Sequence, residues 1–226
     1  MGLMQTIRAA GMAAGIAAVT ALPAGAAVEI EELTRPGATT FWHVQEPTIP
    51  IVSLRASFEG GAALDPEGRA GLSRMTMGLL DEGAGEMDTT AFARRRDALA
   101  AKFSFSTGRD RASVGAEMLV ETLDESAALL AGAITGPRFD PAAIERVRAQ
   151  ILSGLRSDET DPRSVASKAW FARAFEGHPY GTPTDGTEES VAAITREEIV
   201  AQHARLMRRD RAVVSVVGAI GPERAG

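Results

Sequence analysis

An alternation of apolar and polar residues marks a strand in residues 49–58. One side of this segment carries only apolar residues and the other side is mostly polar: Val52, Leu54, Ala56 and Phe58 against Ile51, Ser53, Arg55 and Ser57. A period of two residues predicts a strand with one buried face. Residues 39–44 are expected as its partner strand, with Glu46, Pro47 and Thr48 forming the turn between them.

The period of the pattern then changes from two residues to that of a helix. Residues 66–84 carry an apolar stripe at i, i+3, i+7 and i+8, made by Leu72, Met75, Leu79 and Leu80. Further helices are expected over residues 89–101, 122–133, 140–156, 162–176 and 195–207, a hairpin over 103–107 and 111–118, and a closing strand over 211–217. This order predicts an α+β fold in which an antiparallel sheet packs against helices on one face.

The first 26 residues have the pattern of a signal peptide. Arg8 is their only charge, and an Ala- and Gly-rich run leads to the small-residue site Ala24-Gly25-Ala26. A transmembrane anchor is the alternative, but Gly15 and Pro23 interrupt the run. We therefore expect residues 1–26 to be removed, and residues 27–226 to form a single domain that is periplasmic or secreted and not held by a membrane.

Composition excludes several classes of function. The formal net charge is −6 and there is no Cys, which argues against nucleic-acid binding and removes thiol nucleophiles and Cys-based zinc sites. The three histidines, His43, His178 and His203, are far apart in the sequence. No nucleophile elbow or phosphate loop occurs.

The segment from Gly71 to Gly83 resembles the metal-binding helix of the insulinase/pitrilysin family, in particular the branch related to mitochondrial processing peptidase. The resemblance continues in order along the chain, through residues 39–61, 65–68, 103–107, 178–183, 186–190 and 213–218. It implies a processing-peptidase-like domain. Such a domain occurs twice in family members, so this chain is expected to hold the first repeat only and to be truncated at its C-terminal end.

Active members carry H-x-x-E-H on this helix and a third zinc ligand, a Glu, on a later helix. By the resemblance these positions are Arg74, Met77, Gly78 and Gly154, and a further Glu beside the metal becomes Val147. Arg and Gly offer zinc no lone pair, and a thioether neither accepts protons nor suits zinc. We therefore expect no catalytic residue, metal ligand or cofactor in this chain, and zinc only in a partner subunit.

The remaining candidate site is the strand that follows the second helix. In active relatives the corresponding strand lies beside the metal helix, and substrate peptide adds to it as an extra strand. The resemblance places this role on Phe103, Ser104, Phe105, Ser106 and Thr107, with apolar contacts expected from the two phenylalanines. An ordinary sheet strand is the alternative.

These expectations support one hypothesis and two alternatives. The chain is expected to be a catalytically silent subunit that pairs with a zinc-bearing insulinase-family subunit and helps to form a chamber for unfolded peptide. A structural or assembly role without proteolysis is the first alternative. An active metalloendopeptidase with unrecognised ligands is the second.

Overall fold

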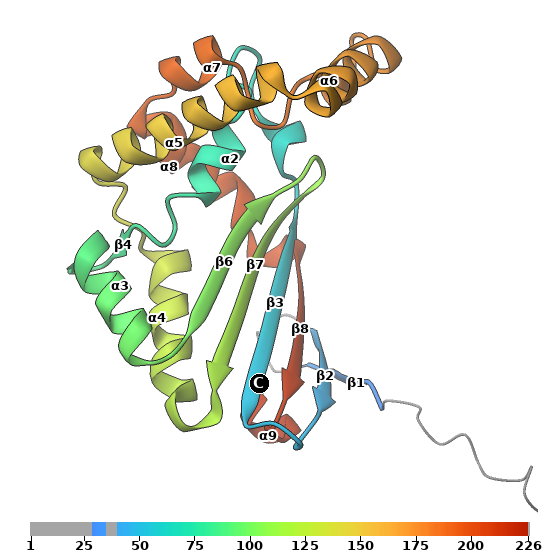
Figure 1. The fold of residues 1–226 in the computed structure, drawn as a ribbon. Coiled ribbons are helices and arrows are strands. Elements are labelled where there is room, and N and C mark those ends of the chain that lie inside the picture. Colours follow the sequence, from blue (N-terminus) through green and yellow to red (C-terminus); the bar gives the residue numbers. More distant parts are fainter. Residues whose placement is uncertain (1–28, 35–39, 226) are drawn as a thin grey trace, which may run out of the picture.

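A six-stranded sheet forms the centre of the computed structural model, which describes residues 29–34 and 40–225 (Figure 1). The predicted signal peptide lies outside these residues. The strand order is β1-β2-β8-β3-β7-β6, and the strands are β1 (Glu31–Leu33), β2 (Phe41–Gln45), β3 (Ile51–Glu59), β6 (Lys102–Thr107), β7 (Arg111–Leu119) and β8 (Ala212–Gly218). Two short strands, β4 (Gly83–Ala84) and β5 (Met87–Asp88), pair separately.

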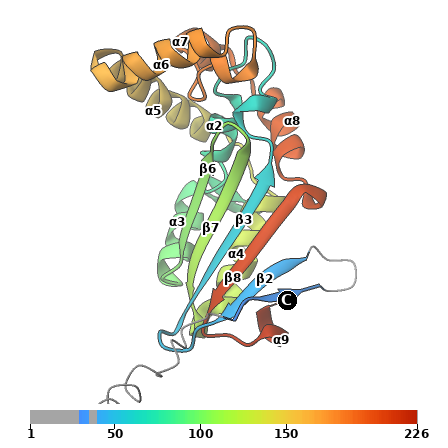
Figure 2. The same ribbon diagram turned by 90° about the vertical axis from the view of Figure 1, so that its right-hand side faces the viewer.

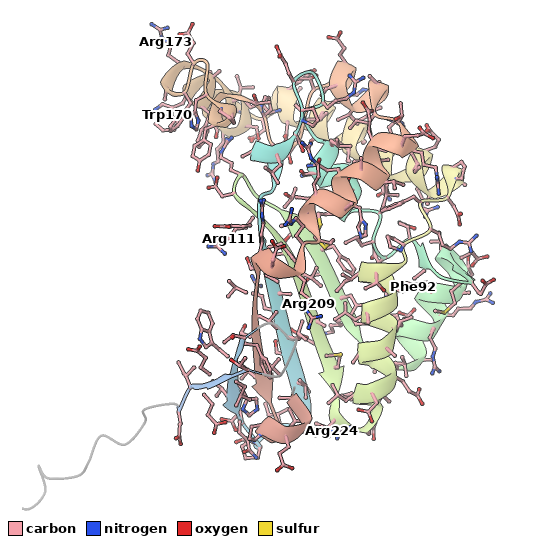
Figure 3. The ribbon with its side chains drawn as sticks, turned by 180° about the vertical axis from the view of Figure 1, so that it is seen from behind. Phe92, Arg111, Trp170, Arg173, Arg209 and Arg224 are labelled. Carbon is pink, nitrogen blue, oxygen red and sulfur yellow. The ribbon has the colours of Figure 1, made fainter. Side chains whose placement is uncertain are left out.

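Helices cover one face of the sheet and one of its ends. The α-helices are α2 (Leu72–Met77), α3 (Thr89–Ala98), α4 (Leu123–Thr135), α5 (Pro141–Thr160), α6 (Pro162–Ala174), α7 (Glu188–Ala193), α8 (Arg196–Leu206) and α9 (Pro222–Ala225). Figure 1 looks onto the uncovered face, and α4 and α8 lie in front of the strands when the molecule is seen from behind (Figure 3). Helices α5, α6 and α7 form a cap at one end (Figures 1 and 2). The predicted α+β fold is confirmed.

Short 3₁₀ turns, η1 (Ala62–Leu64), η2 (Val120–Thr122), η3 (Pro179–Gly181) and η4 (Arg209–Arg211), connect several of these elements. Across the described residues, no helix has the length and apolar character that crossing a membrane requires.

Strand β3 has the predicted faces, but its predicted partner is wrong. Val52, Ala56 and Phe58 are buried, as the alternation requires. However, β2 does not pair with β3. Strand β8 lies between them, parallel to β2 and antiparallel to β3. The connection from β2 to β3 therefore crosses the end of β8. The sheet is mixed, because β2 and β8 are parallel while the other strand pairs are antiparallel.

The helix expected over residues 66–84 is much shorter in the structure. Helix α2 begins after Gly71, which adopts the left-handed conformation, and ends at Met77. The next residues turn toward β4, and Leu79 and Leu80 become fully buried there. Tertiary burial of this apolar pair outweighs continuation of the helix past Gly78, a residue with poor helix propensity.

Several helix starts agree with the sequence because they depend on local capping. Asp88 accepts a hydrogen bond from the Ala91 amide at 2.8 Å. Thr195 and Glu198 form a capping box at the start of α8. Asp140 behaves differently: its carboxylate accepts from Arg138 Nε at 2.7 Å and does not cap α5, which continues four residues beyond the expected end.

Two apolar clusters hold the layers together. The larger lies between the sheet and α2, α4, α5 and α8 and contains Met75, Leu79, Leu80, Val114 and Leu206. The smaller joins α3 and α4 to β6 around Phe92 (Figure 3). Phe103 and Phe105 of β6 contact both clusters, so β6 is anchored by its side chains, while its outer edge has no partner strand among the described residues.

Candidate functional site

Helices α2 and α5 meet the edge strand β6 at a cleft of about 330 Å³. Each element contributes three residues, and together they include most of the positions that the sequence singled out: Arg74, Met77 and Gly78 from α2 and its C-terminus, Phe105, Ser106 and Thr107 from β6, and Val147, Gln150 and Ile151 from α5. Residues separated by more than 70 positions in the sequence therefore meet at one place beside the sheet edge.

The N-terminus of α2 is fixed by a buried polar network around Asp65. The Asp65 carboxylate accepts from the amides of Gly71 at 3.0 Å and Ser73 at 2.9 Å, and from the Ser73 hydroxyl at 2.6 Å. Gln202 of α8 donates to the Ser73 hydroxyl oxygen at 2.9 Å. Burial raises the pKa of Asp65 to about 6, although the hydrogen bonds from Ser73 and Gly71 act to lower it.

Gly78, at the end of α2, lies beside Val147 of α5. A Cβ atom added to Gly78 would lie 3.4 Å from Cγ1 of Val147. Two helical turns after Val147, Gly154 has open space where a side chain would start, with no atom within 4 Å. Gly154 is not one of the described residues that line the cleft. Met77 is only 1% exposed, and its side chain belongs to the larger apolar cluster.

Arg74 supplies the only formal charge among the described residues that line the cleft. Its side chain is 48% exposed and forms an ion pair with Asp185, through Nη1 and the Asp185 Oδ1 atom. Asp185 lies in the loop that precedes Gly186. This loop packs closely on the start of α2, because a Cβ added to Gly186 would lie 2.5 Å from the Ala70 carbonyl oxygen. The loop thus brings Asp185 to the exposed side of Arg74.

The side chains in this cleft do not fit a zinc ion. Catalytic zinc is held by three protein ligands with lone pairs, and the resemblance matches these to Arg74 and Gly78, which line the cleft, and to Gly154, which does not. Throughout residues 29–34 and 40–225, no three His, Cys, Asp or Glu side chains come together in a group suited to a metal ion. The described residues that line the cleft therefore offer no set of zinc donors.

Strand β6 has one free edge, because it is the last strand in the sheet order. The Gly108 amide donates to the Arg111 carbonyl at 2.8 Å across the hairpin turn. Because hydrogen-bonded and non-hydrogen-bonded pairs alternate along antiparallel strands, Ser104 and Ser106 exchange bonds with β7. The main-chain groups of Phe103, Phe105 and Thr107 therefore point to the free edge. This geometry suits addition of an extended peptide.

The phenylalanines of β6 do not have the exposure expected of peptide contacts. Phe103 packs against the core, with its ring centroid 6.4 Å from that of Phe92. Phe105 is also partly buried, although it lines the cleft. An added peptide would meet the main chain of β6 and the serine side chains more than aromatic surface.

The three histidines serve separate local contacts. His43 is buried, with Nε2 at 3.0 Å from the Ile220 carbonyl oxygen. The Tyr180 amide donates to Nδ1 of His178 at 3.2 Å. His203 is partly buried: its Nε2 lies 2.8 Å from the Ile134 carbonyl oxygen, and burial lowers the pKa of His203.

A second hollow, which sequence analysis did not predict, lies next to the cleft, because Asp185 in its lining pairs with Arg74 of the cleft. It has a volume of about 280 Å³ and includes Arg109, Arg163, Lys168 and Phe171 in its lining. In the sequence, Arg109 is an ordinary turn residue between β6 and β7. Arg163 and Lys168 are five positions apart on one helix, a spacing that does not place them on the same face, so the sequence contains no signal for this hollow.

Several known proteins are similar to this chain in sequence. The chain is similar to the non-peptidase homolog YmxG of Helicobacter pylori, with 26% identity over 75% of this chain and 39% of the relative. It is also similar to the probable mitochondrial-processing peptidase subunit beta of Schizosaccharomyces pombe, with 23% identity over 91% of this chain and 44% of the relative. The cytochrome b-c1 complex subunit 1 of Caenorhabditis elegans is 23% identical over 71% of this chain and 34% of the relative. The chain thus spans less than half the length of these relatives.

Among solved structures, a peptidase M16 inactive domain from Pseudomonas fluorescens has the same fold, with a TM-score of 0.83 and 24% identity over 88% of this chain and 48% of that chain. A protease from Helicobacter pylori gives a TM-score of 0.78 at 18% identity, with the same coverage. Residues 41–188 match the family described as Insulinase (Peptidase family M16). The resemblance seen in the sequence is therefore confirmed, and the chain belongs to the insulinase family, peptidase family M16.

Proposed function

We propose that this chain is a catalytically silent insulinase-family subunit that holds extended peptide beside a zinc-bearing partner. One observation carries the proposal: the cleft between α2, α5 and β6 has formed, but Arg74, Met77 and Gly78 stand where the family's metal helix carries its chemistry. The relative named a non-peptidase homolog and the neighbour named an inactive domain support the same conclusion.

The proposed role for β6 is strand addition. Peptide main chain would pair with the outward groups of Phe103, Phe105 and Thr107, which requires neither a metal nor a nucleophile. Main-chain pairing accepts many sequences, so this edge suits unfolded polypeptide. The partner subunit would then supply hydrolysis, and the similarity to a subunit of mitochondrial-processing peptidase supports a two-subunit arrangement.

The proposed location is the periplasm or the exterior of the cell. This part of the proposal rests on the signal-peptide pattern of residues 1–26. Detection of the N-terminus of the protein isolated from its cells, by peptide mass spectrometry, tests it. A start at Ala27 supports export with cleavage, whereas an intact Met1 or Gly2 terminus contradicts it.

Co-expression with a zinc-bearing relative from the same genome tests the pairing. We expect the two chains to co-purify, and the peptidase activity of the pair to exceed that of the zinc-bearing chain alone. In Thr107→Pro the outward amide is lost, which an edge strand tolerates, and activation should fall. Thr107→Val keeps the amide and should activate normally. Full activity of the partner alone, with no binding, would refute the proposal.

A structural or assembly role is the second candidate. The similarity to a subunit of the cytochrome b-c1 complex favours it. The same co-expression experiment separates the two functions. A stable complex whose peptidase activity is the same with wild type, Thr107→Pro and Thr107→Val would indicate assembly without peptide holding.

A further inference from the structure

The cleft beside β6 lies next to a basic hollow, and the chain itself runs from one to the other. Thr107 at the end of β6 lines the cleft, and Arg109, two residues later, lines the second hollow. Arg74 and Asp185 join the two spaces, because Arg74 lines the cleft and its ion-pair partner lines the hollow. A peptide paired with β6 and extended past Thr107 would therefore enter the hollow.

The charge of this region is opposite to that of the whole chain. Four cationic side chains line the two spaces, and two carboxylates accompany them: Arg74, Arg109, Arg163 and Lys168 against Asp158 and Asp185. The local formal excess is positive, whereas the chain carries −6. A positive region on an acidic protein attracts acidic segments and repels basic ones.

The cations are arranged so that they retain donors for a ligand. The Asp185 pair engages Nη1 of Arg74, and a guanidinium group has five N–H donors in a planar fork. Arg109 is held in place: its Nη1 donates to the carbonyls of Tyr180 at 2.8 Å and Thr182 at 3.2 Å, and its guanidinium lies 3.8 Å from the centre of the Phe171 ring.

The nearby acidic groups are engaged with protein partners. Lys168 Nζ lies 3.5 Å from Asp158. The Tyr180 hydroxyl donates to Asp110, beside Arg109 in the hairpin turn, at 2.6 Å. Arg163 lies in the first turn of α6, is exposed, and lines the hollow. Arg74 and Arg163 are thus the cations through which an incoming carboxylate would be bound.

We propose that the peptide held on β6 is acidic, with Asp or Glu side chains or a terminal carboxylate positioned past Thr107 and bound by Arg74 and Arg163. This inference rests on the proposed function and specifies its ligand. Carboxylates accept two parallel N–H bonds from arginine, which gives this contact direction as well as charge. A basic segment in the same place would meet like charges.

The experiment uses three labelled peptides that share an apolar, extended half and differ in their last four residues, which are acidic, neutral or basic. Fluorescence anisotropy gives their dissociation constants for the wild-type chain at low salt and at high salt. Because exposed charge contacts change affinity about two- to fivefold each, the acidic peptide should bind about tenfold more tightly than the neutral one. High salt should remove most of this preference.

Matched variants locate the effect. Arg74→Gln and Arg163→Gln should each reduce the preference for acid about two- to fivefold. Arg173→Gln changes an arginine of the same helix that is 86% exposed and pairs with Glu176, and should leave the preference unchanged. Because Arg163 lies on α6, the Arg163→Gln variant tests the proposal without changing α2. A thermal unfolding curve for each variant checks the fold.

The outcomes separate this inference from the proposed function. Equal binding of the three peptides, or tighter binding of the basic one, overturns the acidic preference while strand addition stands. Failure of all three peptides to bind overturns the proposed function and the inference with it. Acidic binding that is the same in Thr107→Pro as in Thr107→Val refutes the placement of the peptide along β6.

Discussion

Asp65 gives the folded chain an unusual dependence of stability on pH. Its carboxylate sits at the buried start of α2, where burial raises the pKa from 3.8 to about 6. Between these values the folded state holds a proton that the unfolded state has released. The contribution of Asp65 to the free energy of unfolding is therefore fully present below the pKa of the unfolded state, and it is lost as the pH rises through about 6.

The magnitude follows from the size of the shift. A difference of about two pKa units corresponds to about 3 kcal/mol of unfolding free energy. Asp65→Asn has no group to titrate, so its altered hydrogen bonds contribute a term that does not depend on pH. The free energy of unfolding of the wild type relative to Asp65→Asn should thus decrease by up to about 3 kcal/mol between pH 4 and pH 7.

Urea unfolding of both proteins at half-unit steps from pH 4 to pH 7 measures this difference. Asp161→Asn is a matched control, because hydrogen bonds from Ser164 lower the pKa of Asp161. The contribution of Asp161 to stability is lost only as the pH falls below the usual range of carboxyl pKa values. The difference in unfolding free energy between the wild type and Asp161→Asn should therefore not change with pH above pH 5. A flat difference for Asp65→Asn as well, or an Asp65 carboxyl that titrates near pH 4 by NMR, would refute the reasoning.

Three further predictions concern packing, capping and the metal positions. Leu80→Ala removes a side chain with no exposed surface and should lower the free energy of unfolding by about 2–5 kcal/mol in urea titration; a loss below about 1 kcal/mol would contradict its place in the core. Thr195→Ala breaks the capping box of α8 and should cost about 1 kcal/mol by the same measurement, whereas Thr195→Ser should cost less. Atomic absorption should find no stoichiometric zinc in the dialysed wild type, while the triple variant Arg74→His, Gly78→His, Gly154→Glu should retain zinc in a chelator-sensitive way. Zinc in the wild type would overturn the assignment of the degenerate site.

Local signals in the sequence predicted much of the fold. The alternation around Val52 predicted the correct buried face of β3, and the helix starts expected at residues 89 and 195 agree with α3 and α8, which Asp88 and Thr195 cap. These features depend on residues a few positions apart. The insertion of β8 between β2 and β3 was missed because strand order depends on pairing across the whole chain. Helix α2 was overextended because its apolar stripe continues, although tertiary burial of Leu80 ends the helix.

Some features of the candidate site could be predicted from the sequence, and others depend on the fold. The resemblance identified Arg74, Gly78 and Val147, and the structure brings these three together at one cleft. It did not reveal that Arg74 pairs with Asp185, because a contact between residues so far apart in the sequence requires the fold. The position of Arg163 at the second hollow was equally hidden, since the direction of α6 is set by its packing on α5 and not by its own sequence.

The central place of β8 has a consequence for the synthesis of this protein. Ala212 of β8 pairs with Phe58 of β3, and the same strand also completes β2. On the ribosome, β7 follows β3 early, but the other edge of β3 must wait for on the order of 150 further residues, or roughly ten to thirty seconds of translation, before β8 exists. Until then the early strands are open to aggregation, and a chaperone that keeps the nascent chain extended would protect them.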